Sequence, residues 1–229
     1  MNANPFNDFF NLLFPDLCVV CGKNLLKAEQ HICFNCLHAI PKTNYHLEVN
    51  NLIEKRFWGK ASVYRGTAFF FFQKGSPFQK LLHALKYKGN KEIGVVLGKY
   101  AAADLLDSSD FSSIDVIVPV PLHLKRYKKR GYNQSECIAE GLSAILEKPI
   151  DISTLRRVRE NTTQTKKSVY ERYENTEGIF ELMNKNAFSG KHVLLVDDVL
   201  TTGSTLEACI QALLEAEAIT ISIFTLAVA

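Results

Sequence analysis

The sequence predicts an α/β fold, in which a parallel sheet is covered by helices and preceded by a small four-cysteine zinc module. Short apolar runs alternate with amphipathic segments along most of the chain, and this alternation is typical of parallel sheets with right-handed connections. Four of the six cysteines lie close together near the N-terminus. We therefore expect an N-terminal helix and zinc-ribbon module in residues 1–45 and an α/β domain in residues 46–229.

The composition is that of a soluble globular protein, with 47% hydrophobic and 22% charged residues in a chain of 229. A formal net charge of +3 is too small to indicate nucleic-acid binding by itself, so the distribution of the cations matters more. No apolar run reaches the ~20 residues that span a bilayer. We expect no membrane span and a cytoplasmic location, with peripheral association at the inner membrane as a further option.

The first fifteen residues are apolar and rich in phenylalanine. They lack a basic leader and a small-residue cleavage site, so we do not interpret them as a signal peptide. We expect a short helix that packs on the body of the protein. Docking of these phenylalanines on a membrane or a partner is the alternative.

The cysteine pairs Cys18–Cys21 and Cys33–Cys36 have the spacing of a structural zinc site. Two such pairs can direct four thiolates at one tetrahedral centre, and either His31 or His38 is a possible substitute for one cysteine. A disulfide framework would need an oxidising compartment, for which the sequence gives no targeting signal. A redox dithiol would need a single pair beside a βαβ unit. We therefore expect zinc in a structural role, because four protein ligands leave no open position.

The first half of the α/β region is predicted as follows. Residues 41–60 form a linker, and residues 61–72, with their four consecutive phenylalanines, form a hairpin around Arg65 and Gly66. The phenylalanines indicate a strand buried on both faces or an edge that the zinc module covers. Ser76 and Pro77 begin a helix, which is interrupted at residues 86–90 and followed by a second helix.

The second half continues the alternation of strands and helices. Residues 114–119 predict a strand, and residues 135–146 a helix. Between them, residues 125–130 carry five cations in six positions, which indicates a solvated basic loop or a ligand-binding rim. A strand is predicted at 150–155, a long polar loop at 160–177 and a final strand at 219–228. We expect Cys137 and Cys209 to be buried thiols on helices.

The stretch from Val193 to Thr205 has the layout of a ligand site. An apolar strand is followed by Asp197 and Asp198, by a turn of small hydroxyl residues around Gly203, and by an amphipathic helix. Ligands bind at the carboxyl ends of parallel strands, and a helix N-terminus suits a phosphate. Two carboxylates beside a phosphate can accept hydrogen bonds from vicinal sugar hydroxyls. The implied ligand is a ribose 5-phosphate.

This stretch resembles the thirteen-residue signature of type I phosphoribosyltransferases, which have a Rossmann-like fold and bind 5-phosphoribosyl 1-pyrophosphate (PRPP). The resemblance implies that the two acids hold the ribose hydroxyls and act in catalysis, that the turn holds the 5-phosphate, and that Mg²⁺ accompanies PRPP. It also implies that residues 160–177 close over the site. The PRPP-binding residues would be Asp197, Asp198, Val199, Thr201, Thr202, Gly203, Ser204 and Thr205.

The whole chain resembles the ComF/GntX-type family of competence proteins. The resemblance rests on the four-cysteine module, Lys86–Gly89, Val118–Gln134, Arg159–Gln164 and the PRPP signature. Two features depart from the family pattern, namely the spacing within Arg159–Thr162 and the presence of Glu217 where a glycine commonly follows the signature helix. The resemblance implies a PRPP-binding protein that acts in DNA uptake during natural transformation, with single-stranded DNA and the competence machinery as partners.

Several cations are candidates for binding either pyrophosphate or DNA. In an enzyme, three of the arginines would neutralise the leaving pyrophosphate. In a binding protein, Tyr127 and Tyr132 between the cations would stack on bases. A salvage enzyme that transfers the ribose phosphate to a free base is the third hypothesis. Turnover itself and the acceptor stay open. The candidate cations are Lys86, Lys88, Arg126, Arg130 and Arg157.

Overall fold

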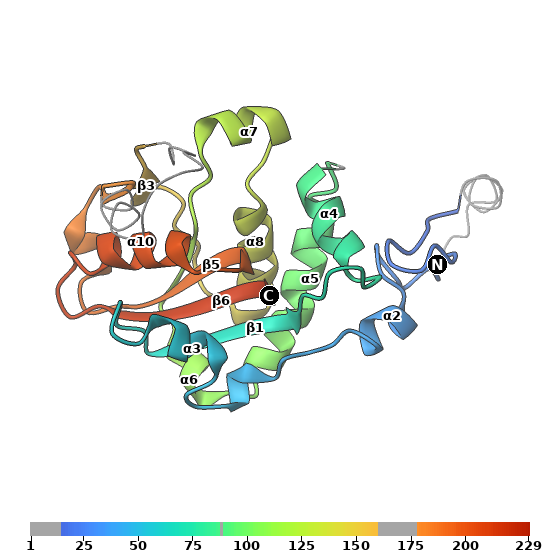
Figure 1. The fold of residues 1–229 in the computed structure, drawn as a ribbon, viewed down its shortest axis with the longest axis horizontal. Coiled ribbons are helices and arrows are strands. Elements are labelled where there is room, and N and C mark those ends of the chain that lie inside the picture. Colours follow the sequence, from blue (N-terminus) through green and yellow to red (C-terminus); the bar gives the residue numbers. More distant parts are fainter. Residues whose placement is uncertain (1–14, 88, 160–177) are drawn as a thin grey trace.

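The core of the protein is a four-stranded parallel sheet. The computed structural model describes residues 15–87, 89–159 and 178–229. The strand order is β1-β6-β5-β2, where β1 is Arg65–Phe71, β6 is Thr220–Val228, β5 is His192–Leu200 and β2 is Val116–Pro119. All three strand pairs are parallel, which confirms the predicted α/β class (Figure 1).

Helices cover both faces of this sheet. On one face lie α5 (Glu92–Leu105) and α8 (Gln134–Leu146), and on the other lies α10 (Ser204–Leu213) with the short strands β3 (Leu155–Arg157) and β4 (Phe180–Leu182) (Figure 1). Alternate residues of β5 supply the two cores: Leu194 and Val196 belong to the first, and Val193 and Leu195 to the second. This follows from the two-residue period of a strand.

Two glycines allow α5 and α8 to pack in close contact. A Cβ on Gly98 would lie 2.4 Å from the Ile138 carbonyl oxygen, and one on Gly141 would lie 2.2 Å from the Val95 carbonyl oxygen. Neither position has space for a larger residue. The close packing of this pair fixes α8, whose first turn lies at the candidate site described below.

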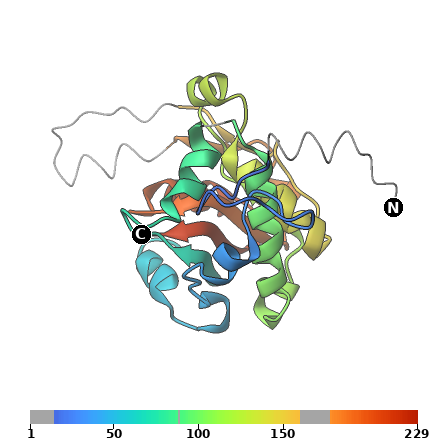
Figure 2. The same cartoon turned by 90° about the vertical axis from the view of Figure 1, so that its right-hand side faces the viewer.

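The four-cysteine module lies at one end of the molecule, beside α4 (Gln79–Tyr87), and contains the short helix α2 (Phe34–His38) (Figures 1 and 2). Cys18, Val20, Ile32 and Cys33 are buried and belong to the same hydrophobic cluster as the apolar face of α4. The module therefore shares the core of the larger unit. The division into residues 1–45 and 46–229 stays a prediction, and the helix expected in the first fifteen residues falls on 1–14, which lie outside the described residues.

The linker expected at residues 41–60 is wrong, because this segment contains a 3-10 helix, η1 (Tyr45–Leu47), and a helix, α3 (Leu52–Phe57). Asn51 caps α3 by accepting hydrogen bonds from the backbone N–H groups of Ile53 and Glu54. An asparagine followed by an acid three residues later is a helix-start signal. The helix is too short for apolar periodicity to reveal it.

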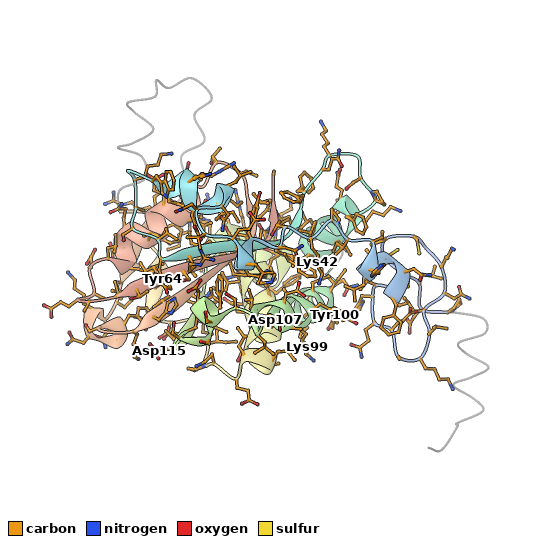
Figure 3. The ribbon with its side chains drawn as sticks, turned by 90° about the horizontal axis from the view of Figure 1, so that it is seen from below. Lys42, Tyr64, Lys99, Tyr100, Asp107 and Asp115 are labelled. Carbon is orange, nitrogen blue, oxygen red and sulfur yellow. The ribbon has the colours of Figure 1, made fainter. Side chains whose placement is uncertain are left out.

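The hairpin predicted around Arg65 and Gly66 is also wrong. Both residues lie inside β1, which pairs in parallel with β6, so there is no turn between them. Gly66 is required because its Cβ would lie 2.7 Å from Ile53 Cγ2 of α3. The free edge of β1 is covered by the segment that follows the module, which includes Lys42 (Figure 3). Phe71 N donates to the Pro41 carbonyl oxygen at 2.9 Å.

Other boundaries differ from the predictions in smaller ways. Helix α4 begins at Gln79 instead of Ser76. The basic stretch is the helix α7 (Leu124–Arg130) and not a loop. The strand expected at 150–155 is reduced to a single bridge at Ile150, and β3 follows it and pairs antiparallel with β4.

Two short helical elements lie outside the main layers. They are α6 (Ser109–Ser112) and a second 3-10 helix, η2 (Lys185–Phe188). The long loop expected at residues 160–177 lies outside the described residues. Among the residues described, no helix combines the length and apolar character that a membrane crossing requires.

Candidate functional site

The two acids of the signature lie near the carboxyl end of β5, and each has partners. Ser135, in the first turn of α8, donates its hydroxyl hydrogen to Asp197 Oδ1 at 3.0 Å, and the Asp198 backbone N–H donates to the same oxygen at 2.8 Å. Lys86 Nζ of α4 lies 2.9 Å from Asp198 Oδ2. Neither acid is therefore buried without a partner.

The pKa of Asp197 is raised from 3.8 to about 7. Burial is the main cause, because it removes the charged form from water, and the neighbouring Asp198 charge adds to it. The hydrogen bonds from Asp198 N–H and Ser135, and the Lys86 charge, oppose the shift. Asp197 therefore titrates near neutral pH, beside an acid that is paired with a lysine.

The turn after the acids has the geometry of an anion cradle. Gly203 has φ of 87°, which glycine adopts without strain, and α10 begins at the next residue. Gly203 gives α10 no side-chain cap, and the Ser204 N–H makes only a long hydrogen bond of 3.5 Å to Thr202 Oγ1, so a ligand at this helix N-terminus could compete for these donors. Thr202 Oγ1 and Ser204 Oγ lie 3.2 Å apart, which places two hydroxyls beside these donors.

A cavity of about 160 Å³ brings the signature together with most of the predicted cations. It lies between the end of β5, the segment that leaves β2 and the start of α8. Positive and negative side chains face the same space, as recognition of a sugar bearing several phosphates requires. The predicted site residues in its lining are Lys86, Arg126, Arg130, Arg157, Asp197, Asp198, Val199 and Thr205.

Other predicted residues lie around this cavity. Thr201 lines a neighbouring cavity of about 360 Å³, together with Asp198 and Val199. Thr202, Gly203 and Ser204 lie in the turn itself and line neither space. Lys88 lies outside the described residues.

The basic helix α7 stands at the rim of the site (Figure 1). His123 begins it by accepting a hydrogen bond from the Lys125 backbone N–H, and Gly131 ends it with φ of 81°. A further cavity of about 510 Å³ is lined by cations of this helix and by Lys86. Arg126 and Arg130 line both this cavity and the smaller one, so they connect the basic rim to the acids.

The two tyrosines expected to stack on bases differ in position. Tyr127 is exposed on α7. Tyr132 is half-buried, and its hydroxyl donates to the Leu85 carbonyl oxygen of α4. Tyr132 therefore joins the start of α8 to α4. Of the two tyrosines, Tyr127 is the one whose ring a single-stranded DNA could reach from solution.

Sequence reasoning missed three residues at this site. Ser135 follows the helix-capping Asn133, which marks the start of α8 but gives no indication of contact with Asp197. Gln134 is buried beside the cavity; its Oε1 accepts from Arg130 at 2.6 Å, and its Nε2 is a donor without a partner among the described residues. Arg56 of α3 lies beside Gly203, where a Cβ would be 3.5 Å from Arg56 Cδ.

The four cysteines of the module converge as the sequence predicts. Their sulfur atoms all lie within 4.8 Å of one another, and Cys21 Sγ lies 3.8 Å from Cys33 Sγ. A tetrahedral zinc with Zn–S bonds of ~2.3 Å has sulfur–sulfur edges of about 3.8 Å, so these residues can hold a zinc ion. His31 instead lies 3.2 Å, through Nδ1, from Asn90 Nδ2, and neither histidine belongs to the cluster.

The thiols of the module differ among themselves: the pKa of Cys18 is lowered, whereas burial raises the pKa of Cys33 and of Cys36, as it does for the two cysteines outside the module. Burial tends to raise the pKa of Cys18, but hydrogen bonds from backbone amides outweigh it and lower the pKa to about 7. A thiol of this kind gives a thiolate readily. Burial raises the pKa of Cys137 to about 12 and that of Cys209 well above its ordinary value. The prediction that these two are buried thiols is confirmed.

The sequence is similar to a known domain and to several named relatives. The phosphoribosyl transferase domain matches residues 132–228. "DNA utilization protein YhgH" of Salmonella typhi is 34% identical over 94% of this chain and 98% of its own length. "Competence protein F" of Haemophilus influenzae is 31% identical over 82% of this chain and 74% of its own length.

"Competence protein ComFC" of Bacillus subtilis is 31% identical over 94% of this chain and 86% of its own length. Similarity at this level extends through both the four-cysteine module and the parallel-sheet unit. The chain therefore belongs to the ComF/GntX-type family of phosphoribosyltransferase-domain proteins.

Proposed function

We propose that this protein binds PRPP with Mg²⁺ in the cavity between β5, β2 and α8, and that it acts in DNA uptake during natural transformation. The proposal rests mainly on one observation: the acid pair, Thr205 at the start of α10 and three arginines all line the same cavity. The relatives' names, which refer to competence and to DNA utilization, supply the cellular process.

Each part of PRPP finds a complementary group. The 5-phosphate suits the turn Thr201–Thr205, where helix N–H groups and hydroxyls are donors. The ribose 2- and 3-hydroxyls suit Asp197 and Asp198, which accept hydrogen bonds when ionised. The pyrophosphate suits the arginines of the cavity, whose forked donors bind phosphate oxygens in pairs.

Magnesium fits this site because Asp197 and Asp198 supply oxygen and negative charge, which a hard cation prefers. When bound with PRPP, it would neutralise pyrophosphate charge and keep several of its waters. The chain itself would orient the ribose through the acids and hold the phosphates through its cations. Lys86, which pairs with Asp198, would exchange this partner for a phosphate oxygen when ribose hydroxyls occupy the carboxylate.

Zinc in the four-cysteine module has a structural role in this proposal. Four sulfur ligands leave no position open for a substrate, so chemistry at this metal is excluded by the ligand set itself. The ion would hold the module in the conformation that contacts α4.

Calorimetric titration of PRPP with Mg²⁺ tests the ribose-phosphate site. We expect the parent protein to bind, and Asp198→Asn with Asp197→Asn to weaken binding by at least about 100-fold, because two charged hydrogen bonds to the ribose are lost. Asp107→Asn is the matched control, since this exposed acid follows α5 and lines none of the three cavities around the acid pair. Absence of binding by folded parent protein would refute the site.

A second titration tests the DNA part of the proposal. Fluorescence anisotropy of a labelled single-stranded oligonucleotide should show affinity that falls steeply between 50 and 200 mM salt, roughly as expected for several phosphate contacts. Lys128→Ala with Lys129→Ala on α7 should weaken binding and reduce the salt dependence by about two phosphate contacts. Lys55→Ala with Lys60→Ala removes the same amount of charge near α3 and should leave both the DNA affinity and its salt dependence unchanged. Equal losses in the two double variants would contradict a specific role for α7.

A further inference from the structure

The cavity between α7 and the end of α4 differs from the one that contains the acid pair. It has a volume of about 510 Å³, whereas the cavity beside Asp197 and Asp198 has about 160 Å³. We call these the outer cavity and the inner cavity. Among the residues that the structure describes, the outer cavity is lined by four cations and a glycine, without a carboxylate or an aromatic ring: Lys86, Gly89, Arg126, Lys129 and Arg130.

Helix α7 concentrates positive charge on the face that borders this cavity. The seven residues of the helix include five cations and no acid. Arg126 lies three and four positions before Lys129 and Arg130, so these three side chains share one face. Like charges at these spacings repel each other and destabilise a helix. A multivalent anion bound between them would offset this repulsion.

The cations of the outer cavity differ in their protein partners. Lys86 Nζ pairs with Asp198 Oδ2 at 2.9 Å, and Arg130 Nη1 donates to Gln134 Oε1 at 2.6 Å. Arg126 and Lys129 are exposed, and their side chains have no hydrogen bond or ion pair within the part of the chain that the structure describes. These two cations can therefore bind an anion from solution without losing a protein partner.

The lining suits a chain of phosphates more than a base or a nucleic-acid strand. Phosphate oxygens accept hydrogen bonds from guanidinium and ammonium groups, which are the side-chain donors of the described lining. Binding of a single strand combines such cations with aromatic rings on which the bases stack. Tyr127, the exposed tyrosine of α7, does not line the cavity. Four cations around a space of this volume suit an anion with several phosphates.

The outer and inner cavities share three of their cations, namely Lys86, Arg126 and Arg130. A side chain that binds an anion in one cavity is less available to the other, and anions in adjoining cavities repel each other. Each cavity also has a cation of its own, because Lys129 lines only the outer cavity and Arg157 only the inner one. The two cavities can therefore be tested separately.

We propose that the outer cavity binds a free polyphosphate chain of three or more phosphates, and that this anion lowers the affinity of the inner cavity for PRPP. The coupling is reciprocal, so PRPP lowers the affinity for the polyphosphate by the same factor. The effect on PRPP rests on the proposed function, whereas the anion site itself does not.

Calorimetric titration of sodium tripolyphosphate into the parent protein and two single variants tests the site. We expect Lys129→Ala to bind this probe at least about tenfold more weakly, because a charged hydrogen bond is lost. Lys128→Ala is the matched control: it removes the same charge from the preceding position of α7, but Lys128 does not line the cavity, so the affinity should stay within about twofold. Equal losses in the two variants, or no binding by the parent protein, would overturn the proposal.

Titration of PRPP in the presence of tripolyphosphate tests the effect on the inner cavity. The probe is present at about five times its Kd for the parent protein, and free Mg²⁺ is held constant because tripolyphosphate also binds this metal. PRPP affinity should fall about threefold or more in the parent protein and less than about twofold in Lys129→Ala. An equal fall in the two proteins would indicate direct competition in the inner cavity and overturn the proposal, as would an unchanged PRPP affinity in the parent protein.

Arg157→Ala separates this proposal from the function on which its second part rests. The variant should weaken PRPP binding while its affinity for tripolyphosphate stays within about threefold of the parent value, since Arg157 does not line the outer cavity. If PRPP binds and tripolyphosphate does not, the outer site falls and the PRPP site stands. If PRPP fails to bind the parent protein while Lys129-dependent binding of tripolyphosphate persists, the PRPP site falls and the outer cavity stands as an anion site.

A polyphosphate chain has two sources, inorganic polyphosphate and a nucleoside triphosphate. ATP should bind within about threefold of tripolyphosphate, because the described lining offers no ring on which a base can stack. ATP binding that is at least about tenfold tighter would assign the cavity to a nucleotide and overturn the base-free ligand. Displacement of tripolyphosphate by a twelve-residue thymidine oligonucleotide at a lower phosphate concentration would assign it to a DNA strand and overturn the free anion.

Discussion

The four-cysteine module and the ligand site both gather ionisable side chains, but they do so in opposite ways. In the module, four sulfur atoms lie within 4.8 Å of one another, a spacing that suits the ligands of one metal ion. In the ligand site, acids and cations line a cavity of about 160 Å³. Four like thiols in a closed cluster suit a structural metal, whereas acids and cations around an open cavity suit a ligand that carries both hydroxyls and phosphates.

The two regions are nonetheless connected through α4. Lys80 Nζ of this helix donates to the Val20 carbonyl oxygen in the module at 2.8 Å, and Asn90, just beyond its end, contacts His31. The same helix carries Lys86, which pairs with Asp198. Helix α4 therefore contacts both the module and the acid pair.

The largest effect should come from breaking the closed cluster. In Cys33→Ser, we expect loss of bound zinc and a fall in Tm of more than ~10 °C, because the binding free energy of a structural metal contributes directly to folding. Metal content by mass spectrometry and Tm by differential scanning fluorimetry are the measurements. His38→Ala, an exposed neighbour outside the cluster, should retain both zinc and Tm. Unchanged zinc content in Cys33→Ser would break the comparison.

The next effect concerns the open site, at the turn that we propose binds the 5-phosphate. Gly203→Ala places a side chain at φ of 87°, so it should cost about 1 kcal/mol of stability and weaken ribose 5-phosphate binding by about tenfold. Gly190→Ala is a matched control, because Gly190 also has positive φ, of 68°, and its Cβ would meet no atom within 4 Å. Both variants should lose similar stability in urea unfolding. Equal ligand affinities in the two would count against the turn as a phosphate site.

A smaller effect concerns the titration of Asp197. Its folded pKa of about 7 lies above the ordinary 3.8, so this group adds stability as the pH falls from about 7 and withdraws it as the pH rises through 7. Ribose hydroxyls donate to the ionised carboxylate, so PRPP affinity should increase as the pH rises through 7.

Ser135→Ala sharpens this prediction. The variant removes a hydrogen bond that lowers the pKa, so the midpoint should move to higher pH and the affinity at pH 7 should fall about threefold. Ser143→Ala, at the other end of α8, removes a hydrogen bond to the Lys148 carbonyl oxygen and should leave the midpoint in place. The measurement is calorimetry of PRPP from pH 6 to 8. A flat affinity profile in the parent protein would show that Asp197 does not face the ribose.

The smallest effect should appear in the connection between the regions. Lys80→Met removes the charged hydrogen bond from α4 to the module and should weaken PRPP binding by only about twofold, because a single partly exposed contact contributes little. Lys185→Met removes the exposed pair with Glu215, remote from α4, and should have no effect on binding. PRPP affinity should also be measured in both proteins after zinc has been removed by chelation. If Lys80→Met and the parent protein then still bind PRPP equally well, the module and the ligand site act independently.

The parts of the fold that the sequence predicts well are those with strong periodicity or chemistry. The apolar run before Asp197, the helix after Gly203 and the paired cysteines each combine a residue type with a spacing, and the structure confirms the sheet, the helix and the convergence of thiols. The structure also places Arg126, Arg130 and Arg157 in the same cavity as the acids of the signature. This follows because parallel strands end at one edge of the sheet.

The parts that the sequence does not predict depend on contacts between distant segments. The partner of β1 is β6, which lies more than 150 residues later in the chain. From the sequence alone, Gly66 indicates a turn; in the structure, it leaves space for the side chain of Ile53 in α3. The contact between Ser135 and Asp197 spans 62 residues and has no local signal. The outer cavity likewise arises only where the end of α4 lies beside α7.

A crystal structure of the protein with PRPP and Mg²⁺ tests the central claim most directly. We expect the 5-phosphate at Thr201–Thr205, the ribose hydroxyls on Asp197 and Asp198, the pyrophosphate among Arg126, Arg130 and Arg157, and Lys86 separated from Asp198. PRPP bound elsewhere, or bound with the Lys86–Asp198 pair intact and the turn unoccupied, would contradict the account.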